Sequence, residues 1–289
     1  MGAWLNVRDG DVSNVLRQLD SLAGAITSDV NTLHNGGYGL DGSTGNNFFR
    51  ALAPSGTGAI TNLGNATISG KMLNPVNVDT DHYQLAYDGT NWTVSNIDKG
   101  GAVAIDSTGG SMTKVPLAAA NSFFAERGYS IALTGNPIAG DTFNVSAVNN
   151  AAVNMALTPA ITNDINKIAA GATTQQGDGA VAQQISALQG EKMMGGEWAP
   201  SGTTGLHSYT DFYASLVGVV GTASKVATDN VTLYQSVSSQ VASMKSQISG
   251  VNMDEEMVNL IKFQNAYQAS AKTITTVDQM LQTLMGIIR

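Results

Sequence analysis

The chain has 289 residues, no cysteine, a formal net charge of −8 and only 12% charged residues. The negative balance argues against nucleic acid as a partner, because phosphate binding needs clustered Lys and Arg. The missing cysteine excludes disulfides, thiol catalysis and cysteine-based zinc sites. No run of 18 apolar residues predicts a membrane helix, and no cationic start followed by an apolar run predicts a Sec signal.

Residues 10–35 are predicted to form an amphipathic helix that ends at Gly36-Gly37. Its apolar residues recur at alternating spacings of four and three, as expected for a helix that contributes to a bundle core. They are Val12, Leu16, Leu19, Ala23, Ile26, Val30 and Leu33.

The apolar period changes to two from Ala51 to about Thr158. Residues 83–87 and 92–94 alternate around an Asp-Gly-Thr-Asn turn, which predicts a β-hairpin. Further strands are predicted near residues 129–133 and 142–148. Because both ends of this segment join helical segments, we expect a β-rich domain inserted into a helical stem.

Helix returns after residue 159. Short helices are predicted near residues 161–168 and 181–188, followed by a Gly-rich link over residues 195–205. A long helix then starts at about Tyr209 and runs to Gly250. One broad stripe holds its apolar residues, namely Leu216, Val219, Ala223, Val226, Leu233, Val237, Val241, Met244 and Ile248.

The last 37 residues are the most informative part of the chain. Asn252 is a predicted helix cap, and Asp254, Glu255 and Glu256 suit the positive end of the helix dipole. A heptad register places an apolar seam along the helix, interrupted by Gln264 and Asp278. The other seam residues are Met253, Met257, Leu260, Tyr267, Ala271, Ile274, Leu281, Met285 and Ile288.

A second apolar face includes Val258, Ile261 and Leu284, so this helix can contact several neighbours. An isolated helix is only marginally stable in water, and we expect the order of this one to depend on its partner. The predicted assembly contacts are therefore Met257, Val258, Leu260, Ile261, Tyr267, Ile274, Leu281, Leu284 and Ile288.

The motifs carry a family resemblance. Residues 249–256 (SGVNMDEE) and 260–269 (LIKFQNAYQA) resemble the C-terminal signature of bacterial flagellar axial proteins. Upstream motifs occur in an order most similar to the hook-associated protein 1 family of hook–filament junction proteins. These motifs are LNVRD at 5–9, GYGLDG at 37–42, DGTNWTV at 88–94, GDTFNV at 140–145 and FYASLVG at 212–218.

The resemblance implies a structural adapter between hook and filament that assembles through coiled coils of its terminal helices. It implies hook protein, other hook-associated proteins and further copies in a ring as partners, with an export chaperone before secretion through the flagellar type III apparatus. Neither nucleic acid nor membrane is an expected partner. The location implied is the extracellular flagellum, and the process is motility. Members of this family begin with a long apolar helix, so we expect this chain to be the C-terminal portion of a longer protein.

The sequence suggests no enzyme. His34, His82 and His207 lie far apart without a second ligand at metal spacing, and we expect them to be solvated surface residues. No nucleophile elbow, P-loop or dinucleotide fingerprint is present. The expected catalytic, cofactor-binding and metal-binding residues are therefore none, and no cofactor is expected.

The expected fold class is α+β and multidomain, with a long-helix bundle or coiled-coil stem and an inserted β-rich domain. The predicted segments are residues 1–50 (first half of the stem), 51–158 (β-rich insertion), 159–250 (second half of the stem) and 251–289 (assembly helix). Two alternatives remain open. One is a different flagellar axial protein, such as flagellin or the second junction protein; the other is a secreted adhesin or hydrolase that uses the β domain.

Overall fold

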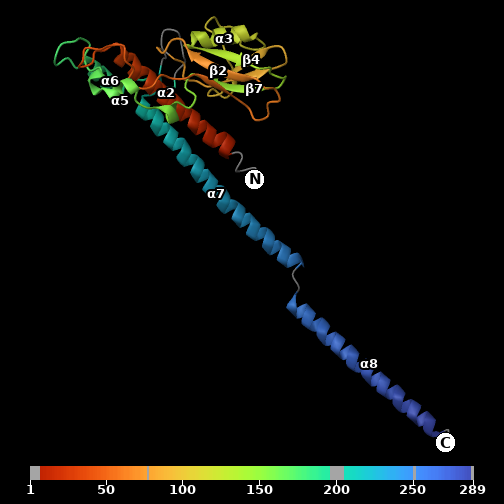
Figure 1. Ribbon diagram of the computed structural model, residues 1–289. Coiled ribbons are helices and arrows are strands. Elements are labelled where there is room, and N and C mark those ends of the chain that lie inside the picture. Colours follow the sequence, from red (N-terminus) through yellow and green to blue (C-terminus); the bar gives the residue numbers. More distant parts are fainter. Residues whose placement is uncertain (1–6, 77, 196–204, 250–251, 288–289) are drawn as a thin grey trace. The chain divides into compact units, whose positions relative to one another are not determined.

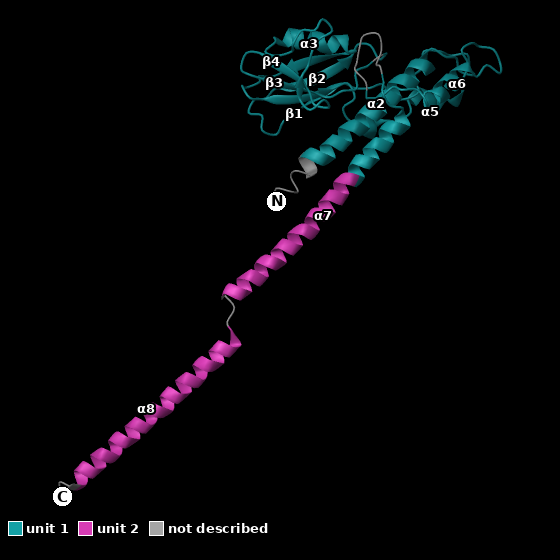
Figure 2. Ribbon diagram, turned by 180° about the vertical axis from the view of Figure 1, so that it is seen from behind, with its two compact units in different colours: residues 1–221 teal, residues 222–289 magenta. Residues whose placement is uncertain are grey.

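The structure is a computed structural model that describes residues 7–76, 78–195, 205–249 and 252–287 (Figure 1). The chain divides into two compact units, residues 1–221 and 222–289, and helix α7 (Tyr209–Ser249) contributes to both (Figure 2). Long helices and an antiparallel sheet confirm the predicted α+β class. The four predicted segment boundaries stay a prediction.

The first unit opens with a helix, as predicted for residues 10–35. A π-helical turn, η1 (Val7–Val12), leads into α2 (Ser13–Asn35). At its end the backbone N–H groups of Gly37 and Gly45 donate to the carbonyl oxygens of His34 and Asn35, at 3.1 and 3.0 Å. These bonds satisfy groups that a helix end leaves unpaired, so the chain turns sharply here.

One seven-stranded sheet forms the centre of the first unit, in the order β5-β4-β3-β7-β1-β2-β6 with antiparallel neighbours. The predicted hairpin is confirmed, because β3 pairs with β4 and Tyr87 lies opposite Trp92. The strands are β1 (Ser55–Gly58), β2 (Thr67–Met72), β3 (Tyr83–Tyr87), β4 (Trp92–Asn96), β5 (Ala102–Val103), β6 (Tyr129–Thr134) and β7 (Thr142–Ser146).

Helix α3 (Leu117–Glu126) packs against β6 and β4 and closes the core of the sheet domain. Its Phe123 and Phe124 stack edge-to-face with Tyr83, and all three side chains are buried. The period-two pattern of the segment did not predict this helix. Aromatic rings from helix α3 and from the strands thus pack in one core, and this core stabilises the sheet domain.

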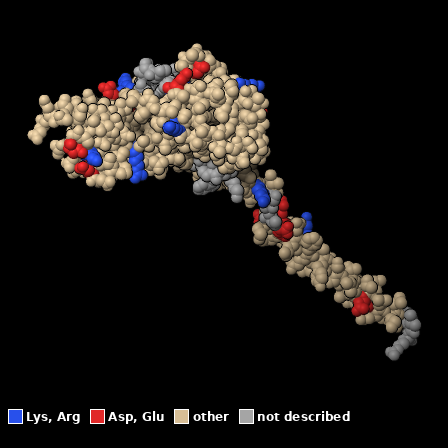
Figure 3. Space-filling model, turned by 45° about the horizontal axis from the view of Figure 1, so that its top comes forward, with Lys and Arg blue, Asp and Glu red and all other residues tan. Residues whose placement is uncertain are grey.

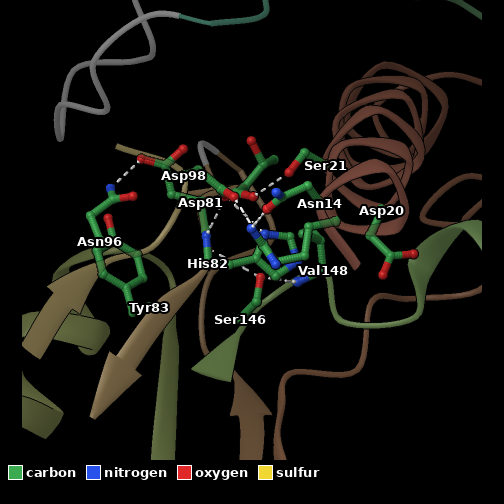
Figure 4. A network of polar contacts seen from close by, with 12 residues as sticks. Asn14, Asp20, Ser21, Asp81, His82, Tyr83, Asn96, Asp98, Ser146 and Val148 are labelled. Atoms are coloured by element: carbon green, nitrogen blue, oxygen red, sulfur yellow. Dashed lines mark hydrogen bonds and ion pairs between the residues drawn. The ribbon is translucent and has the colours of Figure 1, made fainter. Parts of the chain in front are cut away.

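Helix α2 packs beside the sheet domain through small and polar residues (Figure 4). A Cβ atom added at Gly24 would lie 2.2 Å from Val148 Cγ1, so only glycine allows this close approach. The Asp20 carboxylate accepts from the backbone N–H groups of Asn150 and Ala152, at 3.0 and 2.9 Å. The face of α2 that is buried here is thus the small and polar one, and its place in a bundle core stays a prediction.

Along the apolar stripe predicted for α2, Ala23 is buried, whereas Val12 and Leu16 are 45% and 51% exposed. The remaining stripe residues, Leu19, Ile26, Val30 and Leu33, are half-buried. The stripe is therefore only partly covered in the described part of the chain.

The remaining helices follow the sheet. They are α4 (Ala151–Asn154), α5 (Pro159–Asn163), η2 (Ile165–Lys167), α6 (Ala180–Ala187), α7 and α8 (Met253–Ile287). The short helices predicted near 161–168 and 181–188 are confirmed as α5 with η2 and as α6. Most of the predicted Gly-rich link (196–204), the LN of the LNVRD motif, and Gly250 lie outside the described residues. None of the described helices is long and apolar enough to cross a membrane.

Candidate assembly interface

Helix α8 begins as its sequence predicts. The Asn252 side-chain oxygen accepts from the backbone N–H of Asp254 at 3.0 Å, which caps the first turn. Asp254, Glu255 and Glu256 occupy that turn, where negative charge interacts favourably with the helix dipole. The helix start is therefore encoded locally, without help from tertiary contacts.

The predicted seam of α8 faces solvent. Described residues 252–286 are all exposed, so the described part of the second unit leaves the apolar positions uncovered. The exposed fractions of the predicted seam contacts are Met257 59%, Leu260 66%, Tyr267 77%, Ile274 70% and Leu281 55%. Ile288, the last of the predicted contacts, lies outside the described residues.

The second apolar face is exposed to a similar degree, with Val258 at 52%, Ile261 at 50% and Leu284 at 59%. The heptad register missed Phe263, which is 76% exposed although it is the largest apolar side chain of this helix. Counting all large apolar residues, rather than those in register, would have found it. Large apolar surfaces of this kind mark interaction sites in soluble proteins.

Helix α7 carries a comparable stripe within the second unit. In the first unit its initial turns are anchored: the Tyr209 hydroxyl donates to Asp29 of α2, and Leu216 is 4% exposed. Beyond the first unit, Val237 is 45% exposed and the other large apolar residues of the stripe are more than half exposed, namely Val226, Leu233, Val241, Met244 and Ile248. Both long helices thus present unpartnered apolar surface.

The sheet domain carries a polar network where it meets α2, and this network includes His82 (Figure 4). His82 Nδ1 lies 2.9 Å from Asp98 Oδ2, and Arg17 Nε of α2 lies 3.2 Å from Asp98 Oδ1. Burial would raise the pKa of Asp98, but the hydrogen bonds from His82 outweigh it and hold that pKa below its usual range. Asp98 therefore connects α2 to the sheet.

The expectation that the histidines are solvated was wrong for two of the three. His82 is 4% exposed, and His34 is 1% exposed between Asn46 O, 2.7 Å from Nδ1, and the backbone N–H of Ala169, 2.9 Å from Nε2. His207 is exposed, as expected. A residue 135 positions away along the chain satisfies His34, so sequence spacing could not indicate its burial.

A buried ion pair lies deeper in the sheet domain. Arg127 Nε lies 2.9 Å from Asp79 Oδ2, and the Tyr83 hydroxyl donates to the same oxygen at 2.6 Å. Nearby, burial raises the pKa of Asp81 to about 6, and the charge of Asp79 adds to that rise. The Asn96 side chain donates a hydrogen bond to Asp81 at 2.7 Å, which opposes this rise in the pKa. These acidic groups are held by structural partners on neighbouring strands and on the loop after α3.

Within the described ranges, no three His, Asp or Glu side chains gather as a metal ligand set. Charged side chains are few and scattered over the face shown in Figure 3. The exposed apolar surface of the long helices is the candidate interface that these residues provide.

Two family profiles match the ends of the chain. Residues 1–49 match the flagellar hook-associated protein FlgK helical domain, and residues 246–287 match the C-terminal domain of flagellar basal body rod FlgEFG proteins. Flagellar hook-associated protein 1 of Escherichia coli K12 is 28% identical over 99% of this chain and 49% of its own length. The resemblance to the hook-associated protein 1 family is confirmed.

A second relative, flagellar hook-associated protein 1 of Salmonella typhimurium LT2, is 26% identical over 99% of this chain and 49% of its own length. The chain thus spans about half the length of the curated relatives it matches. The solved structure of the flagellar hook junction protein FlgK from Burkholderia pseudomallei aligns with a TM-score of 0.57 at 18% identity. That alignment covers 83% of this chain and 60% of the other, and it shows a common fold.

Proposed function

We propose that the full-length protein is a non-enzymatic structural adapter of the bacterial flagellum, placed between hook and filament. Similarity to hook-associated protein 1 over nearly the whole chain supports this role. The hook protein, other hook-associated proteins and further copies in a ring are the proposed partners. The proposed route is binding to a chaperone, followed by secretion through the flagellar type III apparatus to the extracellular flagellum.

The observation that carries the proposal is the exposed apolar seam of α8. Burying a large apolar side chain stabilises a contact by about 1.5–3 kcal/mol, so the seam gains free energy only when another helix covers it. A heptad register suits a coiled coil. Terminal helices of neighbouring copies would supply these partners and form the inner layer of a tubular assembly.

The first test is deletion of the full-length gene, followed by electron microscopy and an assay of flagellin in the medium. We expect bare hooks together with abundant free flagellin, because the filament would lose the layer on which it is built. Normal filaments would refute the assignment and would return attention to the adhesin alternative.

The seam itself is tested by Leu281→Asp in the full-length protein. A carboxylate in the seam should prevent incorporation into flagella while leaving the sheet domain folded, as judged by near-UV circular dichroism. Thr283→Asp is the matched control, because it adds the same charge two residues away at a heptad position that holds neither seam nor second-face residues, and it should incorporate normally. Normal incorporation of the Leu281→Asp protein would contradict the role of the seam.

A different flagellar axial position is the second candidate, and the rod-type profile over residues 246–287 favours considering it. That profile covers the terminal helix, which a rod protein would also need. Immunogold labelling separates the two: we expect label at the distal end of the hook, whereas label confined to the basal body would favour a rod protein.

A further inference from the structure

Methionine is the one sulfur-containing residue type of this chain, which has 11 methionines and no cysteine. The described methionines of the first unit are all buried or half-buried, whereas those of the second unit are all exposed (Figure 2). The first-unit group consists of Met72, Met112, Met155, Met193 and Met194. The exposed group consists of Met244 on α7 and Met253, Met257, Met280 and Met285 on α8. Among the described residues, accessible thioether sulfur is therefore confined to the long helices.

The contrast in exposure between the two groups is large. Met112 and Met194 of the first unit are each 3% exposed, whereas Met253, Met257 and Met285 of α8 are 73%, 59% and 74% exposed. A peroxide oxidises a thioether only when it reaches the sulfur atom, so the reaction follows exposure. The methionines of α8 should therefore react well before those of the sheet domain.

Most of the methionines of α8 belong to its apolar seam. Met253 and Met257 hold the first two positions of the seam, and Met285 lies near its last. Met280 lies outside this heptad register and is 66% exposed. The seam therefore has oxidisable side chains at both of its ends, and the same helix offers an exposed methionine outside the seam for comparison.

Oxidation changes the chemical character of these positions. When hydrogen peroxide reacts with a thioether, the O–O bond breaks, one oxygen atom forms an S=O bond, and the other leaves as water. The sulfur atom loses two electrons, which reduce the peroxide. The sulfoxide is polar, whereas the thioether is apolar. Burying a polar group without a hydrogen-bond partner lowers the equilibrium constant of a contact by about tenfold or more.

We propose that the seam methionines of α8, Met253, Met257 and Met285, form an oxidation-sensitive site that controls assembly. Peroxide converts them to sulfoxides in the free protein, and the oxidised helix no longer buries its seam against another helix. The sheet domain stays folded, because Met112 in its core is buried. This inference rests on the proposed assembly through α8 and adds the oxidation state of its sulfur atoms as a means of regulation.

The first test measures the reaction in the full-length protein. Purified, unassembled protein is treated with dilute hydrogen peroxide for increasing times and analysed by peptide mass spectrometry. We expect Met253, Met257 and Met285 to be oxidised about tenfold or more faster than Met112 and Met194, because exposure controls access to the sulfur. Equal rates would overturn the proposal, since they would mean that α8 is covered in the unassembled protein.

The second test measures assembly. Untreated and oxidised full-length protein is added to hook-bearing cells that lack the gene, and immunogold labelling counts the hook ends that bind it. We expect oxidation to reduce the number of labelled hook ends by about tenfold or more. Methionine sulfoxide reductases A and B should restore the labelling, because together they reduce both epimers of the sulfoxide. Undiminished labelling after oxidation, or a loss that the reductases do not restore, would overturn the proposal.

Leucine variants assign the effect to the seam, because leucine has nearly the volume of methionine and no sulfur. For each variant the readout is the ratio of labelling after peroxide to labelling before it, so an effect of leucine on binding itself cancels. The protein with Met253→Leu, Met257→Leu and Met285→Leu should keep a ratio near one. Met280→Leu is the matched control and should stay as sensitive as the native protein. Equal sensitivity of the two variants would contradict the role of the seam methionines.

Failure of this inference and failure of the proposed function give different results. Untreated protein that binds hook ends, together with oxidised protein that binds them equally well, would overturn the oxidation-sensitive site and leave the adapter role intact. Untreated protein that binds no hook ends would overturn both. Near-UV circular dichroism of the oxidised protein should match that of the untreated protein, and a loss of this signal would contradict the selective action on α8.

Discussion

The sheet domain buries its largest aromatic residues, whereas helix α8 exposes its own. In the sheet domain Phe123, Phe124, Tyr129 and Phe143 are at most 1% exposed, whereas Phe263 and Tyr267 of α8 are 76% and 77% exposed. The sheet domain therefore contains the apolar surface that stabilises it. Helix α8 has comparable side chains that are exposed, so the burial that would stabilise it must come from contacts outside the described residues.

Charged pairs differ in the same sense between the sheet domain and helix α7. Arg127 and Asp79 have side chains that are 9% and 2% exposed, and Arg127 also lies 3.5 Å from the centre of the Phe123 ring. On α7, Lys225 Nζ lies 3.0 Å from Asp229 Oδ2, close to the 2.9 Å between Arg127 Nε and Asp79 Oδ2. The side chains of Lys225 and Asp229 are 75% and 65% exposed. Because the two pairs have similar N···O distances but differ in burial, we expect their removal to change the free energy of unfolding by different amounts. The following substitutions measure this difference.

Removing one partner of the buried pair should have the largest effect. We expect Asp79→Ala to destabilise the sheet domain by about 5 kcal/mol, because it leaves Arg127 buried without this carboxylate and removes the acceptor of the Tyr83 hydroxyl. Urea unfolding followed by tryptophan fluorescence measures the change. Asp229→Ala is the surface counterpart and should cost less than about 0.5 kcal/mol. Similar losses in the two variants would refute the contrast.

Truncating one phenylalanine in each region compares the packing directly. Phe123→Ala should lower the free energy of unfolding of the sheet domain by about 4 kcal/mol, since it leaves a cavity in a closed core. Phe263→Ala should leave that free energy unchanged, because its side chain is exposed. We expect the second variant to weaken incorporation into flagella instead, and unimpaired incorporation would count against Phe263 as an assembly contact.

Asp81 should make the stability of the sheet domain depend on pH. Its pKa is raised from 3.8 to about 6, so the folded state binds the proton more tightly than the unfolded state. Protonation of Asp81 therefore contributes fully to the free energy of unfolding below pH 4, and this contribution is lost as the pH rises to about 6. Asp81→Asn should become more stable relative to the native chain over this window, by up to about 3 kcal/mol. Urea unfolding at several pH values measures this difference, and a constant difference would contradict the shifted pKa.

A smaller effect than that of Asp81→Asn is expected at the start of α8. Asn252→Ala removes the acceptor of the Asp254 backbone N–H and should destabilise the helix by about 1 kcal/mol. Far-UV circular dichroism of the chain should show a small loss of helix. Asn252→Asp keeps an acceptor at the cap and should preserve the signal; an equal loss in both variants would argue against capping.

Local patterns predicted much of the fold. The helix over residues 10–35, the hairpin around Asp88 and the two long C-terminal helices follow from apolar periodicity and turn residues, which act over a few positions. Helix α3 was missed because its short apolar run lies within a segment of strands, where the two periods are hard to separate. The heptad pattern of α8 is local for the same reason, whereas the use of its seam in assembly stays a prediction.

The sequence by itself determined the main long helices, several strands, the cap of α8 and the register of its apolar seam. Only the tertiary structure decided that α2 buries its polar face, because Gly24 and Asp20 contact Val148, Asn150 and Ala152. Likewise, only the tertiary structure decided that the side chains of His34 and Asp141 are buried. Their hydrogen-bond partners include residues 135 and 78 positions away, and no local pattern records which distant backbone groups a polar side chain will meet.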